Sequence, residues 1–382
     1  MPSRGRVIVP RRSRLVGAGR YVRMRLGQLL RGSPEPAPVG RPDYYKREIH
    51  SSLLIRSSNS LPVREFIPSG HQERNVLDVA RECHLRYGVY PLNFSFPRPE
   101  LMPAKVSSRP HFLSSTIPGE PFSFDSWDDY LAEYRSAYFA LSTKKGGWDT
   151  FRHLEILFSG GIPLMPGLGK THAHSLAHFP KSALVGVYES LVHHGPALPG
   201  PFTQQFFKDF ATEHLSSEAM AGYVLRLTGL DSSSVLFVDE SLPSRTDYLS
   251  AFTYIGLKQA TGQRTQAAFE PHFLFDYFTG DTRTLYGRGF GYSRSLSAAL
   301  RGSVDQVGRS PAQLAELSAP FDAIVIGNYD ANRGLVAELR AQGVPADKFV
   351  CIIGSDLPSD FKLRHDIARS GMAFFVREFV KR

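Results

Sequence analysis

The sequence predicts an α/β protein in which two Rossmann-like, doubly wound domains face each other across a cleft, behind a basic N-terminal tail. Short apolar segments alternate with helical segments over most of the 382 residues, a pattern typical of mostly parallel sheets. The pattern restarts at Ser234 after three consecutive helical segments, which indicates a second sheet. We therefore expect a tail and linker over 1–42, a first domain over 43–228 and a second over 232–382.

The tail carries the positive charge of the chain. Residues 1–41 contain ten Arg, no Lys and one acid, so they account for the whole formal net charge of +9. The neutral remainder predicts no nucleic-acid partner. Residues 21–30 suit a basic amphipathic helix on anionic lipid, although an organelle transit peptide and a solvated arm fit the same composition. Gly32–Pro42 is typical of a stiff, Pro-rich linker.

The composition excludes several protein classes. The two cysteines, Cys83 and Cys351, argue against a disulfide scaffold or a cysteine-rich zinc site, and they fit a reducing compartment. No apolar run approaches the ~20 residues of a membrane-spanning helix. We expect a cytoplasmic protein, with the tail available for peripheral contact with the inner face of a membrane.

In the first domain, apolar spacing and terminal signals predict the elements. The segment 75–88 has apolar residues at helical spacing and Gly88 as a stop, and Ser126 is a plausible N-cap for a helix over 126–137. The other expected elements are strands at 89–96, 111–116, 138–143 and 161–166, and helices at 149–160, 181–194, 201–215 and 217–229.

The second domain begins with an apolar strand over 234–240 that ends in two carboxylates, followed by a helix over 245–262. The remaining expected elements are a short segment at 266–271, a glycine-rich loop at 285–294, helices at 297–307 and 332–343, and strands at 321–328 and 348–356.

The stretch "KKGGWDTFRHLEILFSGGIP" contains the main candidate site. A strand leads into Lys144, Lys145, Gly146 and Gly147, and a helix is expected from Asp149. Glycines allow backbone N–H groups to approach an anion, a helix N-terminus offers unpaired N–H groups, and lysines add charge. The arrangement predicts a phosphate-binding loop without a Walker consensus.

The helix after this loop carries further candidates. Arg152 and Glu155 are one turn apart, so they can share a face, and the carboxylate can accept hydrogen bonds from ribose hydroxyls. Gly161 then turns the chain into the next strand. The alternative interpretation is ordinary: Asp149 caps the helix, Arg152 and Glu155 form a surface pair, and the glycines are turns.

The segment "SAYFALSTKKGGWDTFRHLEILFSGGIPLMPGL…HFPK" resembles the donor site of exostosin-like, GT-B-type glycosyltransferases, most specifically over residues 136–181. The resemblance implies a GT-B-like fold and transfer of a sugar from a nucleotide diphosphate-sugar to a glycan, lipid or protein. The donor contacts that it implies are Lys145, Gly146, Gly147, Asp149, Arg152 and Glu155; Lys144 belongs to the same loop.

The order of the halves departs from that family, in which the donor half normally comes second. Here it comes first, and both "YYKREIH" (residues 44–50) and "FFVREF" (residues 374–379) look like the same inter-domain stretch. We interpret this order as a circular permutation or a fusion of rearranged halves.

Candidates for the base on the acceptor hydroxyl follow strands or open a helix: Asp239, Glu240, Asp247 and Asp356. Arg288, in the loop "YGRGFGYSR", is a candidate contact to phosphate or to an acidic acceptor. There is no D-x-D motif, so we expect no metal and no cofactor, with Lys, Arg and helix dipoles meeting the phosphate charge.

Three other interpretations fit parts of the sequence. The chain can be a non-catalytic nucleotide-sugar-binding or scaffold protein derived from such an enzyme. "GLGKTH" suggests an ATP-binding loop around Lys170, but Leu164 stands where the consensus needs glycine. His174 and His178 suit zinc on a helix, but no acid or cysteine cluster stands beside them.

Overall fold

The protein is an α/β structure with parallel pairing in all of its named strands. The computed structural model describes residues 61–104, 108–118, 124–302, 310–354, 367 and 369–379. The basic tail, the segment 44–50 and Asp356 therefore lie outside the described residues. The prediction of an α/β fold built on mostly parallel sheets is confirmed.

The strands form three sheets. The largest has six strands in the order β2 (Tyr90–Pro91), β11 (Ala373–Val376), β10 (Phe349–Ile353), β9 (Ala323–Ile326), β7 (Val235–Val238) and β8 (Thr265–Ala267). A three-stranded sheet has the order β3 (His111–Leu113), β4 (Ala137–Leu141) and β5 (Ile162–Leu164). A small pair joins β1 (Val63–Arg64) to β6 (Leu198–Pro199).

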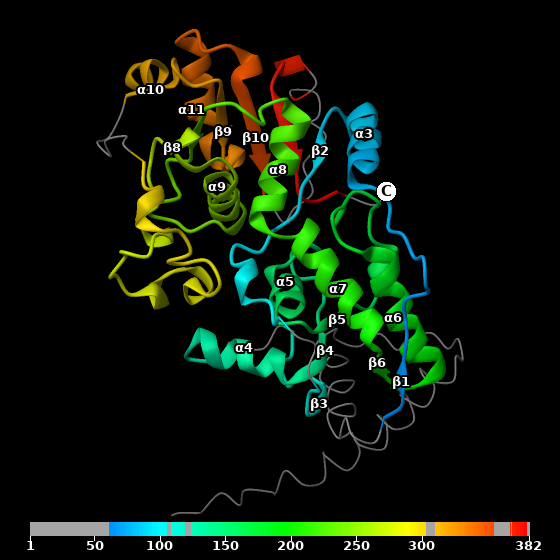
Figure 1. Ribbon diagram of the computed structural model, residues 1–382. Coiled ribbons are helices and arrows are strands. Elements are labelled where there is room, and N and C mark those ends of the chain that lie inside the picture. The colour runs from blue at the N-terminus through cyan, green and yellow to red at the C-terminus, as the bar shows by residue number, and fades with distance from the viewer. Residues whose placement is uncertain are drawn as a thin grey trace, which may run out of the picture.

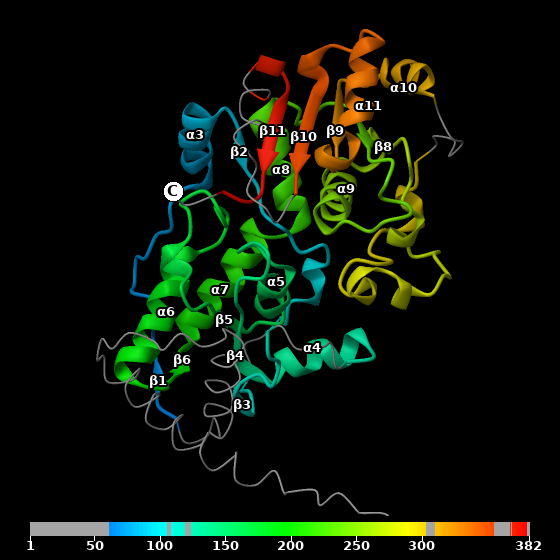
Figure 2. The same cartoon turned by 180° about the vertical axis from the view of Figure 1, so that it is seen from behind.

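Helices cover both faces of the six-stranded sheet (Figures 1 and 2). One face carries α8 (Ser217–Thr228) and α9 (Tyr248–Thr261), and the other carries α10 (Pro311–Ser318) and α11 (Tyr329–Ala341). α3 (Val76–Tyr87) contributes Ala80 to the core on the first face and Cys83 to the core on the second. Successive residues of a strand point to opposite faces of the sheet. In β7, Phe237 therefore packs in the core on the side of α8 and α9, and Leu236 and Val238 pack in the core on the opposite side.

The three-stranded sheet lies in the lower half of Figure 1 with the remaining helices around it. These are α4 (Trp127–Arg135), α5 (Phe151–Phe158), α6 (Lys181–His194) and α7 (Pro201–His214). Short 3-10 turns complete the described elements: η2 (Pro99–Leu101), η3 (Leu168–Lys170), η4 (Gly262–Arg264), η5 (His272–Leu274), η6 (Thr282–Thr284), η7 (Tyr286–Gly289), η8 (Ala298–Leu300) and η9 (Ala346–Lys348).

The division between the sheets does not follow the boundary expected near residues 228–232. β2 precedes that boundary, yet it is the edge strand of the six-stranded sheet, with Tyr90 opposite Phe375 of β11. α8 also precedes the boundary and packs against α9. The β2–β11 pairing joins segments from the two ends of the described chain, so no local sequence pattern encodes it.

Aromatic side chains join the half of the molecule that holds the three-stranded sheet to the half that holds the six-stranded sheet. Phe96, in the loop after β2, stacks on Phe158 of α5 with ring centroids 4.4 Å apart. Phe151 of α5 packs on Phe252 of α9 at 4.7 Å. All four belong to one buried cluster that continues from the three-stranded sheet to the α8–α9 face of the large sheet.

Several predicted terminal signals are confirmed. Gly88 ends α3 in the left-handed region with φ 71°, and Asn75, which was not predicted as a cap, accepts the N–H of Leu77. Ser126 caps α4 by accepting the N–H of Asp129.

Two expected helices differ in extent. α5 begins at Phe151 with Thr150 at its N-cap position, rather than at Asp149, because the Asp149 carboxylate accepts a hydrogen bond from outside the helix. Of the helix expected over 297–307, the described part holds only the 3-10 turn Ala298–Leu300.

Candidate functional site

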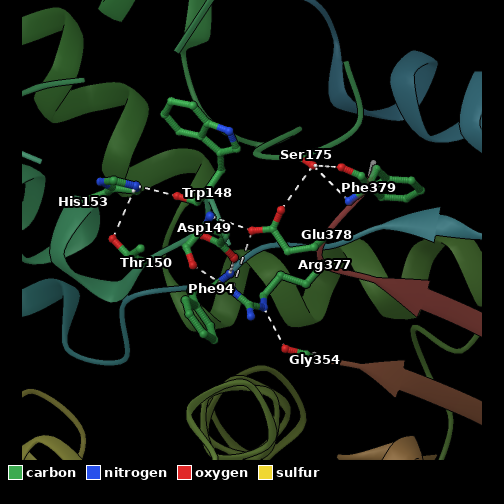
Figure 3. Close-up of polar contacts among 10 residues, drawn as sticks. All are labelled: Phe94, Trp148, Asp149, Thr150, His153, Ser175, Gly354, Arg377, Glu378 and Phe379. Carbon is green, nitrogen blue, oxygen red and sulfur yellow. Dashed lines mark hydrogen bonds and ion pairs between the residues drawn. The ribbon is translucent and has the colours of Figure 1, made fainter. Parts of the chain in front are cut away.

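The candidate site lies where the carboxyl ends of strands from both sheets meet. The loop 142–150 follows β4, Asn93 and Phe94 follow β2, and Arg377 and Glu378 follow β11. Figure 3 shows these segments converging on Asp149. Open α/β sheets bind ligands at such edges, so the location agrees with the expectation for the loop.

Asp149 is the centre of this junction. Its side chain is buried, and its Oδ2 accepts the backbone N–H of Phe94 at 2.6 Å. Its own carbonyl oxygen accepts from Arg377 Nη1 at 2.6 Å, and its backbone N–H donates to Glu378 Oε1 at 2.8 Å. The carboxylate of Asp149 therefore holds the loop to the segment after β2, and its backbone N–H and carbonyl groups hold it to the segment after β11 (Figure 3).

Glu378 fills the turn that was predicted to bind phosphate. Its carboxylate is buried and lies so close to Gly147 that a Cβ atom at position 147 would overlap it. Ser175 Oγ also lies within hydrogen-bond distance of Glu378 Oε2, at 3.4 Å. In this structure, an anion of the chain itself occupies the glycine turn.

Arg377 connects the segments around it. Its Nε donates to the carbonyl oxygen of Gly354, just after β10, at 2.9 Å, and its guanidinium carbon lies 4.4 Å from the Phe94 ring centroid. Nη1 also lies 3.9 Å from Glu378 Oε1. One buried guanidinium thus contacts the ends of three neighbouring strands and the loop after β4.

The charge balance at the junction affects Asp149. Burial raises the pKa of Asp149 to about 7, although Arg377 and the N–H of Phe94 favour the ionised form, and the nearby Glu378 raises the pKa further. Two buried carboxyls thus share one guanidinium, which favours protonation of Asp149 near neutral pH.

A second cluster lies on α4 and α5. Tyr130 donates to Glu155 Oε2 at 2.8 Å and lies 3.0 Å, oxygen to oxygen, from the Tyr134 hydroxyl. Burial raises the pKa of Glu155 to about 7, against the opposing effects of Tyr130, Arg152 and Lys145. The positive charges of Lys145 and Arg152 are therefore close enough to Glu155 to favour its ionised form.

Arg152 differs from the other arginines of the site. Its Nε and Nη1 are buried, and among the described residues neither has a hydrogen-bond partner. Buried donors are nearly always paired, so a water molecule, an ion or a ligand can serve as the partner of these two groups. Burial lowers the pKa of Arg152, but Tyr134, Tyr130 and Glu155 raise it more, and Tyr130 also forms a hydrogen bond with this guanidinium.

His153 fixes the shape of the loop, and the sequence did not single it out. Its Nε2 lies 2.7 Å from the carbonyl oxygen of Trp148, and its Nδ1 lies 2.7 Å from Ser142 Oγ. Burial lowers its pKa to about 4, so the ring is neutral at pH 7. The network assigns the proton to Nε2, which donates to Trp148.

The predicted loop residues divide into two groups. Lys144, Lys145 and Gly146 are exposed, whereas Gly147 is buried against Glu378. Gly161 does not join them. It lies at the start of β5, whereas the loop follows the end of β4, and parallel neighbours place these points at opposite edges of the sheet.

Two of the four predicted catalytic acids, Asp239 and Asp247, accept hydrogen bonds from other groups of the fold. Asp239 is fully buried and accepts from Ser250 Oγ at 2.5 Å and Asn332 Nδ2 at 2.9 Å. Asp247 caps α9 by accepting the N–H of Ser250 at 2.8 Å. Burial raises the pKa of Asp247, Asp239 adds to the rise, and Arg377 opposes it, so Asp247 borders the junction.

Arg288 is tied to the segment before α4. Its Nη1 donates to the carbonyl oxygen of Phe124 at 2.6 Å and to Asp125 Oδ1 at 3.0 Å. Phe290, two residues on, packs against Trp127 and Tyr130. The glycine-rich loop thus borders the Glu155 cluster through Phe290, while Arg288 itself holds the loop.

Arg377 and Glu378 are the main residues of the junction that were not predicted as site residues. A signal was present: the segment 374–379 resembles an inter-domain stretch, and it places an Arg–Glu pair directly after an apolar strand. Within the described ranges, no three His, Cys, Asp or Glu side chains are grouped as metal ligands would be.

Comparisons with known proteins found no match to this chain, either among family models, among curated proteins or among solved structures. In the part of the chain that the structure describes, none of the helices combines the length and apolar character needed to cross a membrane.

Proposed function

We propose that the protein is a glycosyltransferase that moves a sugar from a nucleotide diphosphate-sugar to a glycan, lipid or protein acceptor, with its halves in a GT-B-like relation. The parallel α/β architecture supports this proposal. So does the position of the segment 144–155 at the carboxyl end of β4, where such sheets bind nucleotides.

The state of Arg152 carries the proposal. An unpaired buried donor costs about 1–3 kcal/mol, so a ligand that accepts from Arg152 Nε and Nη1 gains that energy on binding. Phosphate oxygens suit these N–H groups, because a hydrogen bond between a guanidinium and a charged oxygen is stronger than one between neutral groups. A diphosphate is therefore the ligand class that best fits this arginine.

The proposal assigns roles to the neighbouring residues. Arg152 and Lys145 neutralise the leaving diphosphate, and Glu155, oriented by the hydrogen bond from Tyr130, accepts from a ribose or sugar hydroxyl. Among the described residues, Asp247 is the candidate for the base on the acceptor hydroxyl, since the carboxylate of Asp239 accepts hydrogen bonds from Ser250 and Asn332.

Isothermal titration with UDP and GDP tests the proposal. Arg152→Ala is expected to weaken nucleotide binding at least tenfold, because a hydrogen bond to a charged group contributes about 1.5–3 kcal/mol. Arg81→Ala is the matched control, since Arg81 is an exposed residue of α3 paired only locally with Asp78. Absence of binding to the wild-type protein, or equal binding by the Arg152 variant, would contradict the proposal.

A second candidate is a non-catalytic nucleotide-sugar-binding or scaffold protein. The occupation of the Gly147 turn by Glu378 favours it, because that turn is then unavailable to a donor phosphate. A donor screen that measures release of the product nucleotide separates the two. Turnover of any nucleotide sugar excludes the second candidate, and binding without turnover supports it.

A further inference from the structure

We infer that Glu378 is a positioning residue, whose carboxylate, seated against Gly147, holds the loop 144–149 and the start of α5 in the geometry that binds the nucleotide. The nucleotide part rests on the proposed function. The holding of the loop does not, and it can be measured without any ligand.

The contacts of the C-terminal segment are the first argument. Glu378 receives the N–H of Asp149, and the adjacent Phe379 donates its N–H to Ser175 Oγ at 3.0 Å. Ser175 lies in the chain after β5, and Asp149 lies in the loop after β4. The residues after β11 therefore fasten both loops of the smaller sheet to the larger one (Figure 3).

The glycine is the second argument. The φ angle of Gly147 lies outside the left-handed region, so its backbone does not itself require glycine. The three atoms nearest to a Cβ built there all belong to the Glu378 side chain. Glycine at position 147 is thus explained by the approach of this one carboxylate.

The position of the loop is the third argument. The N–H of Lys145 donates to the carbonyl oxygen of Gly147 at 3.0 Å, which closes a tight turn directly before the anchored residues. α5 begins two residues after Asp149. A displacement at Gly147 or Asp149 therefore shifts Lys145 on one side and Arg152 on the other.

The experiment combines hydrogen exchange of the peptide containing residues 145–149 with UDP titration, on the full chain. Glu378→Ala is expected to speed exchange and weaken UDP binding, each at least about tenfold, since the charge-assisted hydrogen bond is lost. Glu378→Gln keeps an acceptor for the Asp149 N–H, so it should stay within about threefold of the wild type.

A double-mutant cycle tests the contact itself. Gly147→Ala is expected to reproduce the effects of Glu378→Ala, and in the Gly147→Ala background Glu378→Ala should add little, because the contact is already broken. Gly222→Ala is the matched control: Gly222 lies in α8 with open space where the added methyl group would point, so neither readout should change.

The outcomes separate the two proposals. Exchange and UDP affinity that stay at wild-type values in both Glu378→Ala and Gly147→Ala would overturn the inference, as would additive effects in the cycle. If the wild-type protein binds no nucleotide, the proposed function fails, while faster exchange in the two variants still shows that Glu378 holds the loop.

Discussion

At the scale of single residues, the junction contains more buried acid than base. Asp149 and Glu378 are both buried beside Arg377, and Asp149 responds by keeping its proton to about pH 7. A carboxyl whose pKa is raised on folding contributes stability below its unfolded pKa and loses that contribution as the pH rises through its folded pKa. For Asp149 this window runs from about 4 to about 7.

Asp149→Asn should remove this dependence. The amide oxygen can still accept the N–H of Phe94, but it cannot ionise. The variant should therefore gain stability relative to the wild type as the pH rises from 4 to 7, on the order of 3–4 kcal/mol. Urea unfolding of both proteins across that pH range measures the difference in stability. Glu155 is present in both proteins, so the effect of its titration cancels in that difference.

Asp78→Asn is the control for this prediction, because Asp78 is exposed on α3 and outside the junction. It should show a constant difference from the wild type over the same pH range. A constant difference for Asp149→Asn as well would mean that Asp149 is ionised throughout in the folded protein.

The limits of sequence reasoning are visible at these residues. The glycines, lysines and Arg152–Glu155 spacing correctly indicated a turn and a helix after β4. The partner of the turn could not be predicted, because Asp149 and Glu378 are 229 positions apart and only the folded sheets bring them together. Gly161 was grouped with the loop because it is near in sequence, although it lies at the other edge of the sheet.

At the scale of elements, two helices are capped by carboxylates distant in sequence. Neither α6 nor α7 has a capping side chain at its N-cap position. Glu73 instead accepts the N–H of Ala183 at the start of α6, and Glu65 accepts those of Phe202 and Thr203 at the start of α7. Gly200 leaves room for Glu65, as Gly147 does for Glu378.

Glu65→Gln should weaken the α7 cap in a pH-dependent manner. Partial burial raises the pKa of Glu65, but hydrogen bonds from Thr203 and Phe202 lower it more, so the net change is downward from 4.5. A lowered carboxyl pKa stabilises the fold above the unfolded pKa, and the contribution is lost as the pH falls through the folded pKa. We expect a loss of about 1 kcal/mol at pH 7.

Urea midpoints at pH 7 and pH 3 check this prediction, because the difference between wild type and variant should shrink at the lower pH. Glu189→Gln, an exposed position on α6, should change neither midpoint. A loss that is equal at both pH values would mean that packing, rather than charge at the helix end, explains the effect.

Element prediction succeeded where the signals are local. The spacing of apolar residues, with Gly88 as a stop and Ser126 as an N-cap, predicted α3 and α4. The strand expected at 89–96 is present as the two residues of β2, but its place beside β11 was not predicted, because that pairing is set by the folded sheet. The caps of α6 and α7 by Glu73 and Glu65 are also contacts between residues that are distant in sequence.

At the scale of the whole molecule, the shared aromatic core predicts cooperative unfolding of the two halves. Phe96 is fully buried, stacks on Phe158, and exchanges backbone hydrogen bonds with Leu215 and Ser217 at the start of α8. Phe96→Ala should cost about 3–5 kcal/mol, because a large buried ring is lost from a packed site. The ring packs on α5, and the backbone of the same residue is hydrogen-bonded at the start of α8, so both halves should lose stability together.

Two probes test this cooperativity. Trp127 and Trp148, the only tryptophans in the sequence, both lie in the half that holds the three-stranded sheet, so their fluorescence reports on that half. Hydrogen exchange of Phe349–Ile353 reports on the six-stranded sheet. In urea, both transitions should coincide for the wild type and shift together in Phe96→Ala. Separate midpoints, or a shift of only one, would show that the halves unfold independently despite the aromatic contacts between them.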